Sequence, residues 1–239
     1  MPDFAARNWR PSRPETASAL FADRLDELRS TLRFQDPGLV AARSGVPYLT
    51  LGPGRGELHI PLWGDVCILS WPELIGYNTV AETLPDFHQA LLLYYLLTAD
   101  GTPLTNKWVS FADLPDGRMY SAAFQGYSGD EIVKRFEHGG QDRVPAKRID
   151  PTSSGIFDNP LHEFEQACLS CGGKPVEIGS ASFTFQALPR VPLMVTYWLG
   201  DEDFPSSCKI LFDASACHYL PIDACAILGS MLTQKLLHS

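Results

Sequence analysis

The chain has 239 residues, of which 45% are hydrophobic and 20% charged, so it is long enough to bury a substantial core. Its formal net charge of -9 and isoelectric point near 5.1 would repel a phosphate backbone, which disfavours nucleic-acid binding. No apolar run reaches the length of a signal peptide at the start, or of a membrane span later. We therefore expect a cytoplasmic protein without nucleic-acid or membrane partners, whose six cysteines stay largely reduced.

The N-terminal part is expected to lead from a flexible arm into helices and then strands. Residues 1–14 hold three arginines and three prolines, which predicts a flexible basic arm before a single domain over residues 15–239. Leucines at helical spacing before residue 33 predict an amphipathic helix, and "DPGLVAARSG" predicts a second helix that ends at glycine. The runs "PYLTL", "GELHIPLWG" and "DVCILSWP" predict an antiparallel meander, because glycine-containing turns separate them.

The middle of the chain contains its most apolar segment. Residues Leu84 to Ala99, "LPDFHQALLLYYLLTA", predict a long apolar central helix. His88 lies one turn inside it and is either an axial ligand, a proton carrier or a partly exposed histidine. The stretch "KWVSFADLPDGRMYSAAF" predicts a strand, a turn and a second strand. A helix over 128–137 and a polar linker follow, and the linker is where two subdomains would divide, near 139–155.

The last third predicts a helix over 159–171, three β-rich runs and a C-terminal helix from Pro221 to Leu237. Helices and strands thus occur in blocks and do not alternate strictly. This order favours an α+β fold with largely antiparallel sheets packed against helices.

The cysteines first raise the question of a metal site. Three cysteines and a histidine lie within "CKILFDASACHYLPIDAC", namely Cys208, Cys217, His218 and Cys225. Their spacings match no tight metal knuckle, and Cys225 shares a helical face with apolar residues. Cys168 and Cys171 in "CLSC" form one pair where a closed site needs four ligands. We interpret these cysteines as packing residues and predict no metal, with a ligand role as the alternative.

The stretch "FDASACH" contains the best catalytic candidates. Asp213 ends a predicted strand and His218 follows in a loop, where a rigid sheet can present side chains to a substrate. His218 would act as acid or base, with Asp213 or Asp223 as its orienting carboxylate. The alternative is structural, because aspartate after a strand often ties off a turn and histidine can bind a backbone carbonyl.

Aromatic residues give a second hypothesis. Four tryptophans lie on or beside predicted strands, and two tyrosines lie on the predicted central helix: Trp63, Trp71, Trp108, Trp198, Tyr94 and Tyr95. If several of them converge, they would line a pocket for a flat cofactor such as a corrinoid or a porphyrin. Ordinary core packing is the alternative.

Three stretches carry a resemblance to a known family: "LLTADGTPLTNKWVSFADLPDGRMY", "FQALPRVPLMVTYWLGDEDFP" and "ILFDASACHYLPIDACAILG". Together they resemble the prokaryotic domain of unknown function numbered thirty-seven eighty-six, common in anaerobic bacteria and archaea. Some members look like fusions to a small four-cysteine iron-sulfur domain of the kind found in corrinoid proteins. This chain lacks that cysteine cluster, so the resemblance implies that any iron-sulfur or corrinoid centre sits on a partner protein.

The resemblance also implies which residues recur. It places Asp100, Gly101, Trp108, Arg190, Trp198, Asp201, Asp213 and His218 in the family's motifs without giving them roles. The family pattern has Thr-Glu-Asp after "HYLP", whereas this chain has Ile222, Asp223 and Ala224 and so keeps only one acidic group.

Two functional hypotheses follow. The first is an accessory domain of anaerobic one-carbon or redox metabolism that binds a corrinoid or porphyrin, or docks to a cofactor protein. Its cofactor contacts would be Trp108, Arg190, Trp198 and Asp100. The alternative is a hydrolase or lyase with Asp213, His218 and Asp223 as catalytic residues.

Overall fold

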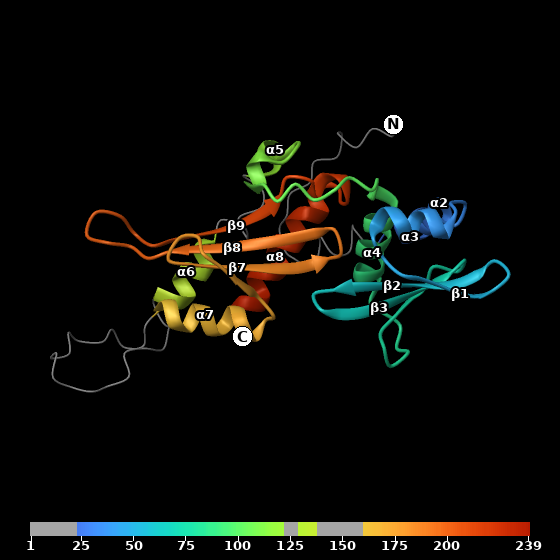
Figure 1. Ribbon diagram of the computed structural model, residues 1–239, viewed down its shortest axis with the longest axis horizontal. Helices are drawn as coiled ribbons and strands as arrows, with labels where there is room; N and C mark the ends of the chain where they lie inside the picture. The colour runs from blue at the N-terminus through green and yellow to red at the C-terminus, as the bar shows by residue number, and fades with distance from the viewer. Residues whose placement is uncertain (1–22, 122–128, 138–159) are drawn as a thin grey trace.

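Two antiparallel β-sheets and the helices packed on them make up the fold (Figure 1). The computed structural model describes residues 23–121, 129–137 and 160–239. This architecture confirms the predicted α+β class. Within those residues, no helix is both long and apolar enough to cross a membrane. The predicted arm over residues 1–14 and the predicted division near 139–155 lie outside the described residues.

The first sheet is the predicted meander, in the order β1-β2-β3-β4. Its strands are β1 (Tyr48–Gly52), β2 (Arg55–Leu62), β3 (Asp65–Trp71) and β4 (Gly76–Tyr77). Buried and more exposed side chains alternate along β2, as in a sheet with one face on the core. Trp63 and Gly64 join β2 to β3 with φ of 55° and 93°, the positive pair that a two-residue hairpin turn favours.

Three helices accompany this sheet: α2 (Leu25–Leu32), α3 (Pro37–Ser44) and α4 (Asp86–Thr98). Helix α3 is capped at its N-terminus by Asp36, whose carboxylate accepts a hydrogen bond from the Leu39 N–H at 2.8 Å. It ends at Gly45, which has the left-handed φ of 70° that a helix C-terminus commonly requires. The helices lie on one side of the sheet (Figure 1).

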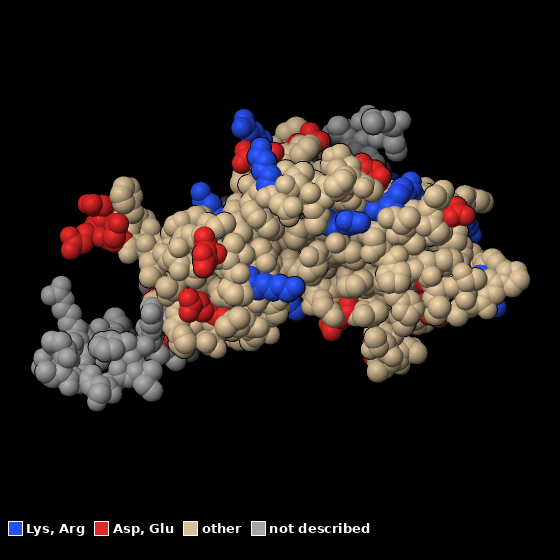
Figure 2. Space-filling model, viewed as in Figure 1, with Lys and Arg blue, Asp and Glu red and all other residues tan. Residues whose placement is uncertain are grey.

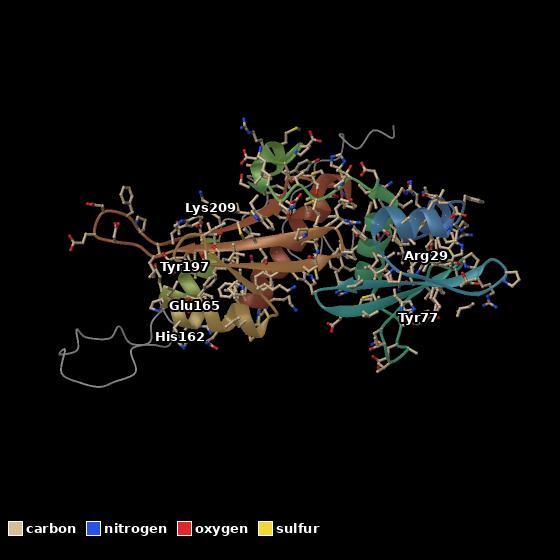
Figure 3. The ribbon with its side chains drawn as sticks, in the orientation of Figure 1. Arg29, Tyr77, His162, Glu165, Tyr197 and Lys209 are labelled. Carbon is tan, nitrogen blue, oxygen red and sulfur yellow. The ribbon has the colours of Figure 1, made fainter. Side chains whose placement is uncertain are left out.

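The second sheet has the order β5-β9-β8-β7-β6. Its strands are β5 (Trp108–Ser110), β6 (Lys174–Val176), β7 (Ala181–Leu188), β8 (Val191–Trp198) and β9 (Ser207–Asp213). Three helices pack beside it: α6 (Asp130–Glu137), α7 (Pro160–Ser170) and α8 (Ile222–Leu237). Figure 3 labels His162 and Glu165 on α7, and Tyr197 and Lys209 on the neighbouring strands β8 and β9. The β8–β9 hairpin projects from the body of the molecule (Figure 1).

The predicted strand after the "PDG" turn is wrong. Strand β5 is followed by a 3₁₀-helix (Phe111–Asp113) and by α5 (Gly117–Ser121). Asp116 adopts a positive φ of 62°, and the Gly117 N–H donates to the Leu114 carbonyl at 2.9 Å. The chain therefore turns away from the sheet, and Gly117 packs so tightly that a Cβ would lie 1.9 Å from a carbonyl oxygen of the 3₁₀-helix.

The two sheets meet in one hydrophobic core that contains residues of both. The Trp63 N–H on the β2–β3 turn donates to the carbonyl of Ala187 on β7 at 2.9 Å. Tyr95 of α4 donates to the Ser44 carbonyl and accepts from the Arg190 N–H at 3.1 Å, so α3, α4 and the β7–β8 turn are tied together. Residues 99–107, here called the junction segment, carry the chain from α4 to the second sheet.

Candidate functional site

The junction segment lies against residues 214–221, the β9–α8 connection, which contains a 3₁₀-helix (Ala216–His218). The Asp100 N–H donates to the His218 carbonyl at 3.3 Å. The Tyr219 hydroxyl donates to the Thr102 carbonyl. Side chains that are more than a hundred residues apart in the sequence thereby share one surface.

Asp213, the last residue of β9, anchors these two segments. Its carboxylate accepts five hydrogen bonds: from the N–H and hydroxyl of Thr105 at 3.1 and 2.9 Å, from the Asn106 N–H at 2.6 Å, and from the N–H and hydroxyl of Ser215 at 2.9 and 2.6 Å. The residue is only 1% exposed. Burial raises the pKa of Asp213, but the bonds from Ser215 and Thr105 outweigh burial and bring the pKa below its ordinary value of 3.8. Four of these bonds reach Oδ1 and one reaches Oδ2, so the carboxylate of Asp213 holds the junction segment and the β9–α8 connection together.

His218 and Asp100 form an exposed pair beside this anchor. The His218 Nδ1 lies 2.7 Å from the Asp100 Oδ2, and the Thr102 hydroxyl lies 3.2 Å from the same nitrogen. The two side chains are 49% and 50% exposed. The hydrogen bond from His218, together with bonds from Thr102, lowers the pKa of Asp100 to about 2, so its carboxylate stays ionised at neutral pH. With Nδ1 facing Asp100, the nitrogen left for a substrate is Nε2.

The carboxylate beside His218 is thus not one of the two named from the sequence. The carboxylate of Asp213 accepts hydrogen bonds from the backbone and hydroxyl donors around it. Asp223 lies in the first turn of α8, exposed, and accepts from the Ala224 N–H at 3.0 Å. The resemblance placed Asp100 among the recurring residues, but no local pattern pairs it with a histidine 118 residues away.

Three of the four predicted cofactor contacts lie near this end of the second sheet. Asp100 belongs to the exposed pair. Trp108 opposes Asp213 in the β5–β9 pairing. Arg190 lies in the β7–β8 turn, where its N–H binds Tyr95.

Trp198 lies elsewhere. It pairs with Ser207 at the far end of the β8–β9 hairpin, and the Lys209 Nζ lies 5.7 Å from its ring centroid. Leu193, which opposes Phe212 at the near end, is five residues back along β8, so the two ends are roughly 17 Å apart. Among the described residues, no ring contact joins two of the four tryptophans that the sequence singled out. The cofactor-binding hypothesis stays a prediction.

The cysteines lie mostly in the core, and all six are free. Burial raises the pKa of the Cys168 thiol, and raises that of Cys208 to about 12. A thiol binds metal as thiolate, so burial of this kind disfavours ligation. In the part of the chain that the structure describes, no three His, Cys, Asp or Glu side chains are placed to hold a metal ion. His88 is half-buried on α4, and burial lowers its pKa.

Comparison with protein families decides the affiliation. The family model described as "Domain of unknown function (DUF3786)" matches residues 36–146 and 147–235. The chain belongs to the DUF3786 family. The resemblance noted in the sequence is thereby confirmed, whereas an iron-sulfur or corrinoid partner stays a prediction. The first matched segment contains Asp100 and the second contains His218, so both parts of the DUF3786 match contribute to the exposed pair.

A second likeness is partial. The chain is 33% identical to cyclin-dependent kinase 10 of Bos taurus over 92 residues. These residues are 38% of this chain and 24% of the kinase, so the alignment spans about a quarter of that protein. Such a short stretch does not bear on activity. No solved structure matches this chain.

Proposed function

We propose that this DUF3786 protein is a hydrolase or lyase in which His218 transfers a proton through Nε2. The observation that supports the proposal is the 2.7 Å contact between the His218 Nδ1 and the Asp100 carboxylate on an exposed surface. A carboxylate at Nδ1 selects the tautomer with its proton on that side, which leaves the Nε2 lone pair free to accept another proton.

Proton transfer from a positioned histidine serves both reaction classes. In hydrolysis the Nε2 would take a proton from the attacking water, and in elimination it would take a proton from carbon. The imidazolium would then return the proton to the leaving group. Asp100 stays ionised throughout, because its pKa is about 2, and its charge would stabilise the imidazolium. Asp100 is therefore a positioning residue in this proposal, and His218 is the catalytic one.

The buried anchor supports the same interpretation. A general base is efficient only when its ring is held in one place, and ordinary loops are too mobile for that. Here the five bonds to Asp213 lock the junction segment to the end of β9, a few residues before His218. The Tyr219 hydroxyl adds a bond on the other side, to the carbonyl of Thr102.

A substrate-independent experiment tests the proposal. The purified chain is incubated with an extract of small metabolites, and mass spectrometry follows which compounds disappear. We expect at least one compound to be consumed by the wild type, and to be consumed roughly 100-fold more slowly by the His218→Gln variant. His238→Gln is the matched control, because this exposed histidine lies at the C-terminal end of α8, where its Nδ1 contacts the Gln234 carbonyl at 2.8 Å.

Two results would refute the proposal. One is consumption at the same rate by the wild type and by a His218→Gln variant with a wild-type circular dichroism spectrum. The other is the absence of any compound that the wild type consumes, with extracts from several anaerobic and aerobic organisms.

A further inference from the structure

Arg190 has an unusual environment for an arginine that is partly buried. It lies in the turn between β7 and β8. In the described part of the chain its guanidinium takes part in no ion pair and no hydrogen bond, and the bond from its backbone N–H to the Tyr95 hydroxyl is the only one the residue donates. Partly buried arginines are usually paired with an acid, because a charge that loses water needs a partner.

The arginine side chain is nevertheless held in one place. Its stem crosses Gly45 at the end of α3, where a Cβ would lie 2.9 Å from the Arg190 Nε and 3.6 Å from its Cδ. Gly45 has a φ of 70°, so both the backbone conformation and the available space require glycine at this position. The bond to Tyr95 fixes the backbone of the same residue. An ordered side chain that binds a ligand loses little further entropy.

A continuous set of contacts connects Arg190 to His218. Tyr95, which accepts from the Arg190 N–H, lies with its ring 6.1 Å from that of Tyr219. The Tyr219 hydroxyl donates to the Thr102 carbonyl, and the Thr102 hydroxyl lies 3.2 Å from the His218 Nδ1. The arginine and the exposed histidine are therefore connected through Tyr95, Tyr219 and Thr102.

Two carboxylates, those of Asp100 and Asp213, belong to the same region as Arg190, but neither forms an ion pair with its guanidinium. Burial is the main cause that raises the pKa of Tyr219, while Arg190 lowers it and Asp100 and Asp213 raise it, so all three charges act on one phenol. Asp100 faces His218, and Asp213 is surrounded by five donors. Neither carboxylate pairs with the guanidinium. Figure 2 shows Lys and Arg side chains (blue) at the surface near the middle of the visible face.

We propose that Arg190 binds an oxyanion, either a carboxylate or a phosphate group, of the substrate on which His218 acts. This inference rests on the proposed function and narrows its substrate class to anionic compounds. The planar guanidinium presents parallel N–H donors that match both oxyanions, and one such charge-assisted pair orients a ligand as well as binding it. The reacting bond would lie at the other end of the substrate, within reach of the Nε2.

Nuclear magnetic resonance of the chain, with inorganic phosphate and with malonate as probes, tests the inference. The imidazole signals of His218 and the backbone amide of Arg190 are followed during each titration, and sodium chloride keeps the ionic strength constant. We expect a saturable shift in the wild type, with at least one of the two anions. The Arg190→Gln variant should bind that anion at least tenfold more weakly, and Arg190→Lys should fall between the two because it keeps the charge but loses the planar donors.

The control variant is Arg55→Gln, which removes an exposed arginine from β2 of the first sheet and should leave the affinity unchanged. Tighter binding of phosphate would assign the substrate to phosphate esters, and tighter binding of malonate would assign it to carboxylic acids. Equal affinity of the wild type and Arg190→Gln for both anions would overturn the inference, and so would the absence of saturable binding in the wild type.

The two proposals fail in different ways. If His218→Gln consumed metabolites as fast as the wild type while Arg190 still bound the anion, the proton-transfer function would be refuted and the anion site would stand. If consumption required His218 but Arg190→Gln changed neither anion binding nor the Michaelis constant, the anion site would be refuted alone.

Discussion

Two aspartates at the junction of the sheets differ in what surrounds them. Asp213 is 1% exposed and accepts five hydrogen bonds from its neighbours. Asp100 is half exposed, and the side chain of His218 faces it at 2.7 Å. Both carboxylates have a lowered pKa, yet for different reasons: hydroxyl and backbone donors act on Asp213, and a histidine acts first on Asp100.

The difference suggests different tasks for two aspartates of one small region: Asp213 holds the chain segments together, and Asp100 is proposed to position His218. A buried carboxylate that accepts five hydrogen bonds from two chain segments is suited to holding those segments rigidly together. A carboxylate paired with one exposed imidazole adds little stability and leaves the other nitrogen of the ring open to solvent. The perturbed pKa by itself would not have distinguished them.

The largest expected effect is on stability, at the buried anchor. Replacing Asp213 with alanine leaves the donors of Thr105, Asn106 and Ser215 without an acceptor, so the free energy of unfolding should fall by about 3 kcal/mol. Urea unfolding measures the change. Asp65→Ala, at an exposed position beginning β3, is the control and should shift the free energy by less than about 0.5 kcal/mol. A similar small loss at Asp213 would show that the five bonds are not an anchor.

The next effect is on activity, at the exposed pair. Asp100→Asn keeps the shape of the side chain but removes the charge that orients and stabilises the imidazolium, so turnover of the compound identified by metabolite profiling should fall at least ~10-fold. The free energy of unfolding should change by no more than about 1 kcal/mol, because the pair is exposed. A large loss of stability with unchanged turnover would reverse the roles of the two aspartates.

The contribution of Asp213 to the free energy of unfolding should decrease gradually as the pH is lowered. The folded pKa of Asp213 lies below its ordinary 3.8, so its contribution to stability is complete above that value and is lost as the pH falls through the folded pKa. Urea unfolding of the wild type and of Asp213→Asn, from neutral pH downward, measures this contribution as a difference. The gap between the two curves should narrow in acid. A constant gap would mean that the charge of Asp213 does not contribute.

The smallest expected effect is at Tyr219. Its hydroxyl donates to the Thr102 carbonyl, so Tyr219→Phe should reduce the free energy of unfolding by about 1 kcal/mol. Tyr95→Phe is the matched comparison, because that hydroxyl both donates to Ser44 and accepts from Arg190, and its loss should cost more. Equal costs would argue that only the rings, and not their hydroxyls, hold the junction.

Local patterns in the sequence anticipated the secondary structure well. The glycine-containing turns marked the meander of β1 to β3, and the glycine of "DPGLVAARSG" marked the end of α3. One exception is α5, because "GRMYS" has no strong preference and only the left-handed Asp116 and the tight packing of Gly117 turn it into a helix. Strands β4 and β6 were also missed, since two or three residues are too few to show a period.

What the sequence by itself determined is most of the order of helices and strands, since that order follows from residue types and short spacings. His218 as a catalytic residue stays a prediction. Only the tertiary structure decided which carboxylate meets that histidine. Asp213 is five residues from His218 and turns its acceptors toward Thr105 and Asn106, while Asp100 comes from the end of α4 to reach it. The reason is physical: the pairing of β5 with β9 brings the junction segment against the β9–α8 connection, and this pairing is non-local.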